Sequence, residues 1–131
     1  MSTTPADDLP TPTLATLLSE RIARRDAPVV PDQSAAAVAA RLDQWLRTAH
    51  QQRNSLRRNC LAQMLLWLLA QPEADTATLH AAGGVGPRSG ARAVRLLAGW
   101  GLTTHATRQR VHYHRLTRAA EDALLPVVAG A

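Results

Sequence analysis

The chain has 131 residues, 46% of them apolar, which is enough for one compact core with an appendage and too few for several large domains. Aromatic residues make up only 3%, so the core must consist of leucine, valine and alanine, which suits packed helices and argues against a large sheet. The net charge is +5, all 15 basic residues are arginine, and ten lie between residues 53 and 118 beside only two acidic residues, which favours a polyanionic partner.

The first part of the chain predicts a tail followed by a helical arm. Residues 1–12 are rich in Ser, Thr, Pro and Asp and have little to bury, so we expect a disordered tail. Residues 13–54 are expected to form the arm, with one helix over 13–25 and a second that starts near Ser34 and carries an apolar stripe to Ala49. We interpret the arm as a dimerisation element; the alternative is that its helices fold back and thicken a monomer.

The main domain is predicted over residues 55–126. Its first helix is expected to run over residues 56–71 with Ser55 as N-cap, and it is apolar on more than one side, which predicts neighbours on two faces. Cys60, the only cysteine, lies in this apolar run and is expected to be buried. No secretory signal and no membrane-spanning run are visible, so we expect a cytoplasmic protein without a membrane partner.

A glycine-rich turn comes next, after a short helical stretch. Gly83, Gly84 and Gly86 permit the positive φ values that a tight corner between two helices needs. Pro87 fits the first position of a new helix, and Gly101 is a suitable residue to close it. A helix is therefore expected between these two residues.

This helix is predicted to have one packed side and one cationic side. Val94 and Leu97 mark the packed side. Gly90 is a poor helix former that costs about 1 kcal/mol relative to alanine, so either a neighbouring helix approaches closely there or the helix starts elsewhere. The outward-facing candidates for binding are Arg88, Ser89, Arg92 and Arg95.

Two strands over residues 102–107 and 111–116 are predicted to form a hairpin with arginines at its tip. Because the tip lacks an Asn-Gly or Asp-Gly pair, we expect a loose connection. Thr117 can cap a last helix that Pro126 stops, which leaves residues 127–131 as a tail.

Histidines lie along the same hairpin. His112 and His114 share one strand face, and His105 lies across the hairpin from them. Two histidines without a cysteine or carboxylate at ligand spacing are a weak zinc signal, so we expect no metal and no other cofactor. Positions on the sheet surface or near a nucleic-acid backbone are the favoured interpretation, and near phosphates such a pair would bind more tightly when protonated.

Residues 75–120 resemble the winged helix-turn-helix of MarR-like bacterial transcriptional regulators. Gly-Val-Gly-Pro at 84–87 is similar to the start of that family's recognition helix, and Gly-Leu at 101–102 to the start of its wing. Arg110 matches the wing arginine, and Leu-Thr at 116–117 is similar to the signature that leads into the last helix. The fold expected is mainly α with a small β-hairpin wing: a winged helix-turn-helix plus N-terminal helices.

The resemblance and the charge together imply a sequence-specific regulator that binds double-stranded DNA as a homodimer, with repression as the expected outcome. The recognition helix would enter the major groove, and the wing would reach the minor groove or its backbone. Base contacts are expected from Arg88, Ser89 and Arg92, backbone or minor-groove contacts from Arg95, Arg108 and Arg110, and further phosphate contacts from Arg57 and Arg58.

A rival hypothesis keeps the fold and changes the partner: the arginines bind an acidic protein rather than DNA. An enzyme is not expected, because neither a phosphate-cradling Gly-x-x-x-x-Gly-Lys nor a Gly-x-Ser-x-Gly motif occurs. The sequence specifies neither the operator nor a small-molecule effector.

Overall fold

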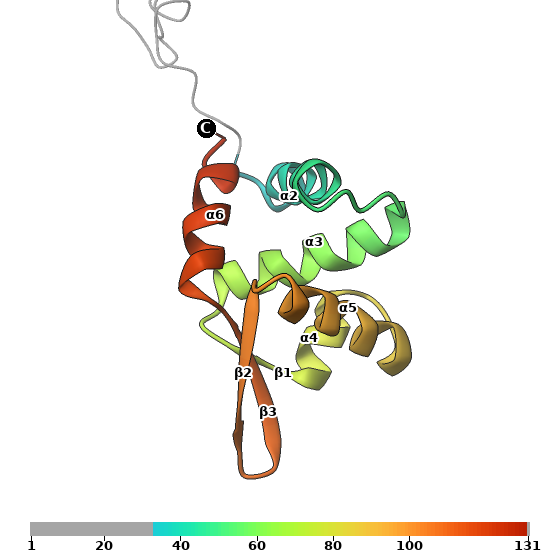
Figure 1. Cartoon of the computed structure of the whole chain (residues 1–131), viewed down its shortest axis with the longest axis vertical. Helices are drawn as coiled ribbons and strands as arrows, with labels where there is room; N and C mark the ends of the chain where they lie inside the picture. Colours follow the sequence, from blue (N-terminus) through green and yellow to red (C-terminus); the bar gives the residue numbers. More distant parts are fainter. Residues whose placement is uncertain (1–32, 131) are drawn as a thin grey trace, which may run out of the picture. The chain divides into compact units, whose positions relative to one another are not determined.

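The structure, a computed structural model, describes residues 33–130, so the expected tail over 1–12 and the expected helix over 13–25 lie outside the described residues. The described part is mainly helical, with five helices and a three-stranded antiparallel sheet (Figure 1). In chain order the elements are α2 (Ala35–Ala49), α3 (Ser55–Ala70), β1 (Ala74–Asp75), α4 (Thr76–Ala82), α5 (Pro87–Gly99), β2 (Thr103–Arg108), β3 (Val111–Leu116) and α6 (Arg118–Val128).

Helix α2 begins and ends where its sequence predicts. The hydroxyl of Ser34 accepts a hydrogen bond of 3.2 Å from the amide of Ala37, which caps the first turn. Val38, Leu42 and Leu46 recur along one face and are buried in the same core as α3 and α6. For this helix, the packing is that of the alternative in which the arm folds back.

Helix α3 runs through the centre of the core. Asn54, rather than the expected Ser55, is its N-cap, because the Asn54 side chain accepts a 3.0 Å hydrogen bond from the amide of Arg57. Buried residues occur around the helix, and α2 packs on one side while α4, α5 and β3 pack on others. The prediction of neighbours on two faces is confirmed, as is the burial of Cys60, which is 4% exposed.

Strand β3 is the middle strand of the sheet, between β1 and β2. The pairing of Arg108 with Val111 leaves a two-residue tip, Gln109 and Arg110, whose φ values are 51° and 67°. Two consecutive positive φ values are typical of a type I′ turn, so the expectation of a loose tip was wrong. The six residue pairs between β2 and β3 impose the tight turn although its sequence does not favour it.

Helix α6 corrects the predicted end of the main domain. The helix continues through Pro126 to Val128, so residues 127 and 128 are not part of a tail. Pro126 lacks an amide hydrogen for the turn before it. Tertiary contacts compensate: Nη1 of Arg41 on α2 donates a 2.8 Å hydrogen bond to the carbonyl of Val128, and Val127 packs against the core.

Candidate nucleic-acid interface

The turn between α4 and α5 uses its glycines for two different reasons. Gly84 has a φ of +68°, which non-glycine residues rarely adopt. Gly83 has an ordinary φ of −75°, but a Cβ there would lie 2.9 Å from both Cys60 Sγ and Met64 Cε of α3. Only Gly84 therefore needs the positive φ that we expected of the turn glycines, and Gly83 permits close packing on α3.

Helix α5 begins at Pro87, as predicted, and its inner side packs against the core. Ala93 and Leu97 are buried there. Gly90 is buried too, and an added Cβ would overlap the imidazole ring of His80 on α4. The close approach of a neighbouring helix thus explains this glycine, and the alternative of a different helix start is wrong.

The far end of α5 is also anchored. Trp100, the C-cap of α5, stacks on the His50 ring with 4.3 Å between ring centroids, and Trp45 of α2 meets the same ring edge-on at 4.8 Å. Burial lowers the pKa of His50 below its ordinary value of 6.5. Helix α5 is thus attached to α4 near its start and to the α2–α3 connection at its end.

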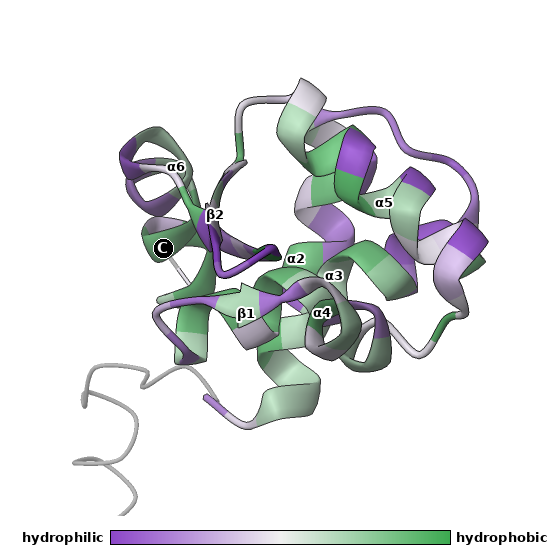
Figure 2. Cartoon of the chain, turned by 90° about the horizontal axis from the view of Figure 1, so that it is seen from below, coloured by the Kyte–Doolittle hydropathy of each residue, from purple (hydrophilic) through white to green (hydrophobic). Residues whose placement is uncertain are grey.

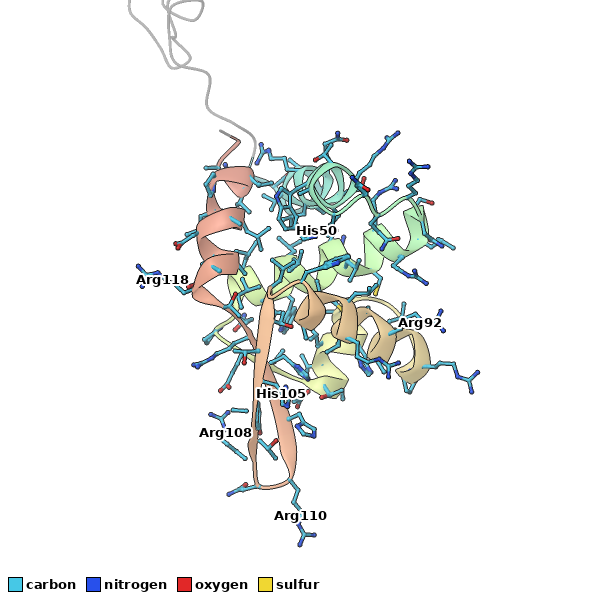
Figure 3. All side chains as sticks on the ribbon, in the orientation of Figure 1. His50, Arg92, His105, Arg108, Arg110 and Arg118 are labelled. Atoms are coloured by element: carbon cyan, nitrogen blue, oxygen red, sulfur yellow. The ribbon has the colours of Figure 1, made fainter. Side chains whose placement is uncertain are left out.

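The outer side of α5 is polar and exposed. In Figure 2, hydrophilic and hydrophobic stretches alternate along the helix, as expected for one packed and one solvated side. Figure 3 shows Arg92 extending away from the helix. The exposed side chains, none of which forms a hydrogen bond or ion pair with another described residue, are Arg88, Ser89, Arg92 and Arg95.

The start of α3 lies beside this outer side. A hollow of about 380 Å³ is bounded by Arg57 of α3 and by Ser89 and Arg92 of α5, so the structure brings these three predicted residues together. Asn54 and Asn59 line the same hollow. Sequence reasoning missed both, although an asparagine before an apolar helix is a capping signal. The positive end of the α3 dipole adds to the charge of the guanidinium groups here.

The Arg58 side chain forms its contacts within the protein. Its Nε lies 3.0 Å from Asp43 Oδ1, and its Nη1 donates hydrogen bonds of 3.1 and 2.8 Å to the carbonyls of Gln52 and Arg53. The side chain is only 13% exposed. Arg58 thus fastens α2 to the start of α3, and its position does not favour the phosphate contact expected of it.

The two hairpin arginines also differ. Arg108 forms a 2.6 Å ion pair with Glu73, and its guanidinium lies 4.1 Å from the centre of the Tyr113 ring. The hydrogen bond to Glu73 raises the pKa of Arg108 above its ordinary value. Arg110, at the tip, is exposed and has no hydrogen-bond or ion-pair partner among the described residues, and Figure 3 shows it pointing away from the hairpin.

The hairpin face opposite Arg108 carries three imidazole rings. The His105 ring lies 5.1 Å from that of His112 and 5.9 Å from that of His114. His114 is buried rather than on the sheet surface, and its Nε2 lies 2.9 Å from the hydroxyl of Thr76. Burial is the main cause that lowers the pKa of His114, and the neighbouring His105 and His112 add to it.

Within residues 33–130, no group of three or more histidine, cysteine, aspartate or glutamate side chains is arranged to hold a metal ion. No helix in that part is long and apolar enough to cross a membrane. Exposed guanidinium groups on a rigid helix can bond the oxygens of phosphates or the acceptor atoms of guanine, because their donors form a planar fork. No family model, curated protein or solved structure matches this chain.

Proposed function

We propose that this protein is a winged helix-turn-helix regulator of transcription that binds double-stranded DNA in a sequence-specific manner. The observation that supports this function most is the contrast between the two sides of α5. One side packs against the core through Gly90, Ala93 and Leu97, while the other presents exposed guanidinium groups that have no partner among the described residues. A rigid, cationic helix of this kind fits the major groove.

The spacing of the arginines along α5 supports a reading role. Arg88, Arg92 and Arg95 follow one another at four and three residues, so they form a single stripe on the helix. At 1.5 Å per residue the stripe is about 10 Å long, close to three steps of about 3.4 Å along a DNA strand. In the proposal, Arg88, Ser89 and Arg92 contact base edges, and Arg95, nearer the C-terminal end, contacts phosphate.

The hairpin tip supports a second contact. Arg110 keeps a positive φ of 67°, a conformation that a side chain with a Cβ adopts only at a cost in free energy. Its side chain is exposed and has no hydrogen-bond or ion-pair partner among the described residues. In the proposal, Arg110 contacts the minor groove or its backbone, where the negative potential attracts arginine. Arg108 instead ties the hairpin to Glu73 and keeps it in position.

The proposal includes a homodimer whose two copies of α5 engage half-sites about 34 to 36 Å apart. Among the described residues, Leu125 on α6 and Trp67 on α3 are large apolar side chains that are 57% and 39% exposed, and they are available for such an association. Repression in the cytoplasm is the expected outcome, because a bound dimer obstructs the polymerase.

The test is to select duplexes from a random pool and to measure their affinity by fluorescence anisotropy as the salt concentration rises. We expect affinity to fall by on the order of 10³-fold between about 50 and 200 mM salt. Arg92→Ala should lose discrimination between sequences, whereas Arg95→Ala should weaken binding to all sequences alike. Arg47→Ala, an exposed arginine on α2, is the matched control.

The same measurement separates duplex DNA from an acidic protein as the binding partner. If the protein ignores duplex DNA even at low salt, the DNA-binding proposal is wrong. Binding to an acidic protein that is lost in Arg92→Ala would then favour the interaction module.

A further inference from the structure

A second hollow lies between α5 and the hairpin. It has a volume of about 260 Å³ and is lined by Arg95 of α5, by Thr76 of α4 and by the imidazoles of His105, His112 and His114. Figure 3 shows His105 on the side of the hairpin that faces α4 and α5, away from Arg108. The hollow therefore joins the two elements to which we assign DNA contacts.

The imidazoles in this hollow are not equivalent. His114 is 7% exposed and paired with the hydroxyl of Thr76, so it belongs to the wall of the hollow. His112 is exposed, and its Nδ1 lies 2.9 Å from the hydroxyl of Thr107, which leaves its Nε2 for another partner. His105 is exposed and has no hydrogen-bond partner among the described residues. The two exposed rings can each direct an N–H group into the opening.

We propose that this hollow binds a phosphate oxyanion between Arg95 and the protonated rings of His105 and His112, and that DNA affinity therefore rises as the pH falls. The inference rests on the proposed function, since the anion it names is a backbone phosphate of the DNA that α5 reads. A free phosphate group is chemically the same ligand, and the experiment separates the two sources.

The charges around the hollow couple proton uptake to anion binding. Arg95 lines the opening beside the two exposed imidazoles and carries a permanent positive charge, so the hollow attracts an anion. His80 and Asp75, on the α4 side, act electrostatically on His114 with opposite signs. A phosphate neutralises Arg95 and favours the charged rings, and histidine is the side chain that ordinarily changes its charge between about pH 5 and 8.

The test compares DNA affinity near pH 7.5 and pH 5.5 at constant ionic strength, with circular dichroism to verify that the chain is folded. We expect binding to tighten by about tenfold at the lower pH, and the salt dependence to steepen by about 0.9 for each additional phosphate neutralised. The double variant His105→Gln, His112→Gln should bind DNA with no such pH effect. Arg115→Gln, on the opposite face of β3, should keep the pH effect although it removes a positive charge.

An affinity that is equal at both pH values, or a double variant that keeps the pH effect, would overturn the inference and leave the DNA-binding function standing. If no duplex binds at either pH, the proposed function fails and inorganic phosphate becomes the deciding probe. The ring-proton NMR signals of His105 and His112 should then shift with phosphate but not with chloride at matched ionic strength. Signals that respond equally to both salts would overturn the phosphate site as well.

Discussion

Gly90 provides the sharpest test of how α5 is held. Gly90→Ala places a methyl group where the His80 ring lies, so the ring or the helix must move. Alanine is intrinsically better than glycine inside a helix by about 1 kcal/mol, whereas inserting a methyl group into a packed site costs about 1 to 3 kcal/mol. Taking about 2 kcal/mol as the packing cost, we expect the free energy of unfolding to fall by about 1 kcal/mol.

A double-mutant cycle isolates the contact. Nε2 of His80 is buried and has no hydrogen-bond partner among the described residues, so His80→Ala removes the ring together with a costly polar atom. In that background Gly90→Ala should stabilise the protein by about 1 kcal/mol, which corresponds to a coupling energy of about 2 kcal/mol. Gly99→Ala is the control in the same helix, since a Cβ at Gly99 would meet no atom of residues 33–130 within 4 Å.

The assay is urea unfolding followed by circular dichroism for the two single variants, the double variant and the Gly99→Ala control. If Gly90→Ala stabilises the otherwise unchanged protein as much as it stabilises the His80→Ala variant, the close approach of α4 and α5 is not what requires the glycine.

Three other predictions concern the hairpin tip, Arg58, and the two histidines whose pKa is lowered by burial. Arg110→Gly should raise the free energy of unfolding by about 1 kcal/mol, because glycine adopts the φ of 67° freely. The same variant should bind DNA more weakly, as measured by fluorescence anisotropy. A variant that binds DNA as tightly as the unchanged protein would exclude the contact of the hairpin tip. Arg58→Ala should lower the free energy of unfolding by about 2 kcal/mol, because it breaks an ion pair and two carbonyl hydrogen bonds. The control Arg57→Ala should change the free energy of unfolding by less than about 0.5 kcal/mol. Equal urea midpoints for the two variants would contradict this prediction. Burial lowers the pKa of His50 and of His114 in the folded state, so the unfolded chain binds more protons than the folded one as the pH falls. The stability that these two histidines contribute should therefore be constant above pH 6.5 and fall as the pH drops below it. Equal urea midpoints near pH 7.5 and 5.5 would argue against this effect.

The predicted acid effects on stability and on DNA binding have opposite signs. Acid weakens the fold through His50 and His114, whereas it should strengthen DNA binding through His105 and His112. A gain in affinity at low pH therefore cannot result from unfolding.

Local chemistry was enough to predict several elements. The start of α2 follows from Ser34, whose hydroxyl caps the helix, and the start of α5 follows from Pro87, whose ring suits a first helical position. The inner side of α5 follows from the spacing of small and apolar residues. In each case the deciding feature is a residue type or a spacing that recurs within a turn or two, so the sequence itself contains the information.

Only the tertiary structure separates arginines that look alike in the sequence. Arg57 and Arg58 are adjacent, but Arg58 reaches Asp43, 15 residues away, and Arg57 lines a hollow with Arg92. Arg108 is 35 residues from Glu73, and no sequence pattern predicts that ion pair. Whether a guanidinium is free to bind a partner depends on such distant contacts.

The backbone conformation, too, depends in some places on local preference and in others on contacts between distant segments. Pro126 is a reliable helix breaker by its local chemistry, but α6 passes through it because α2 holds the last turn through Arg41. At Gln109 and Arg110 the pairing of two long strands overrides an unfavourable turn sequence. Secondary structure here was determined locally wherever caps and spacing agreed, and by packing between distant segments wherever local preference and the core conflicted.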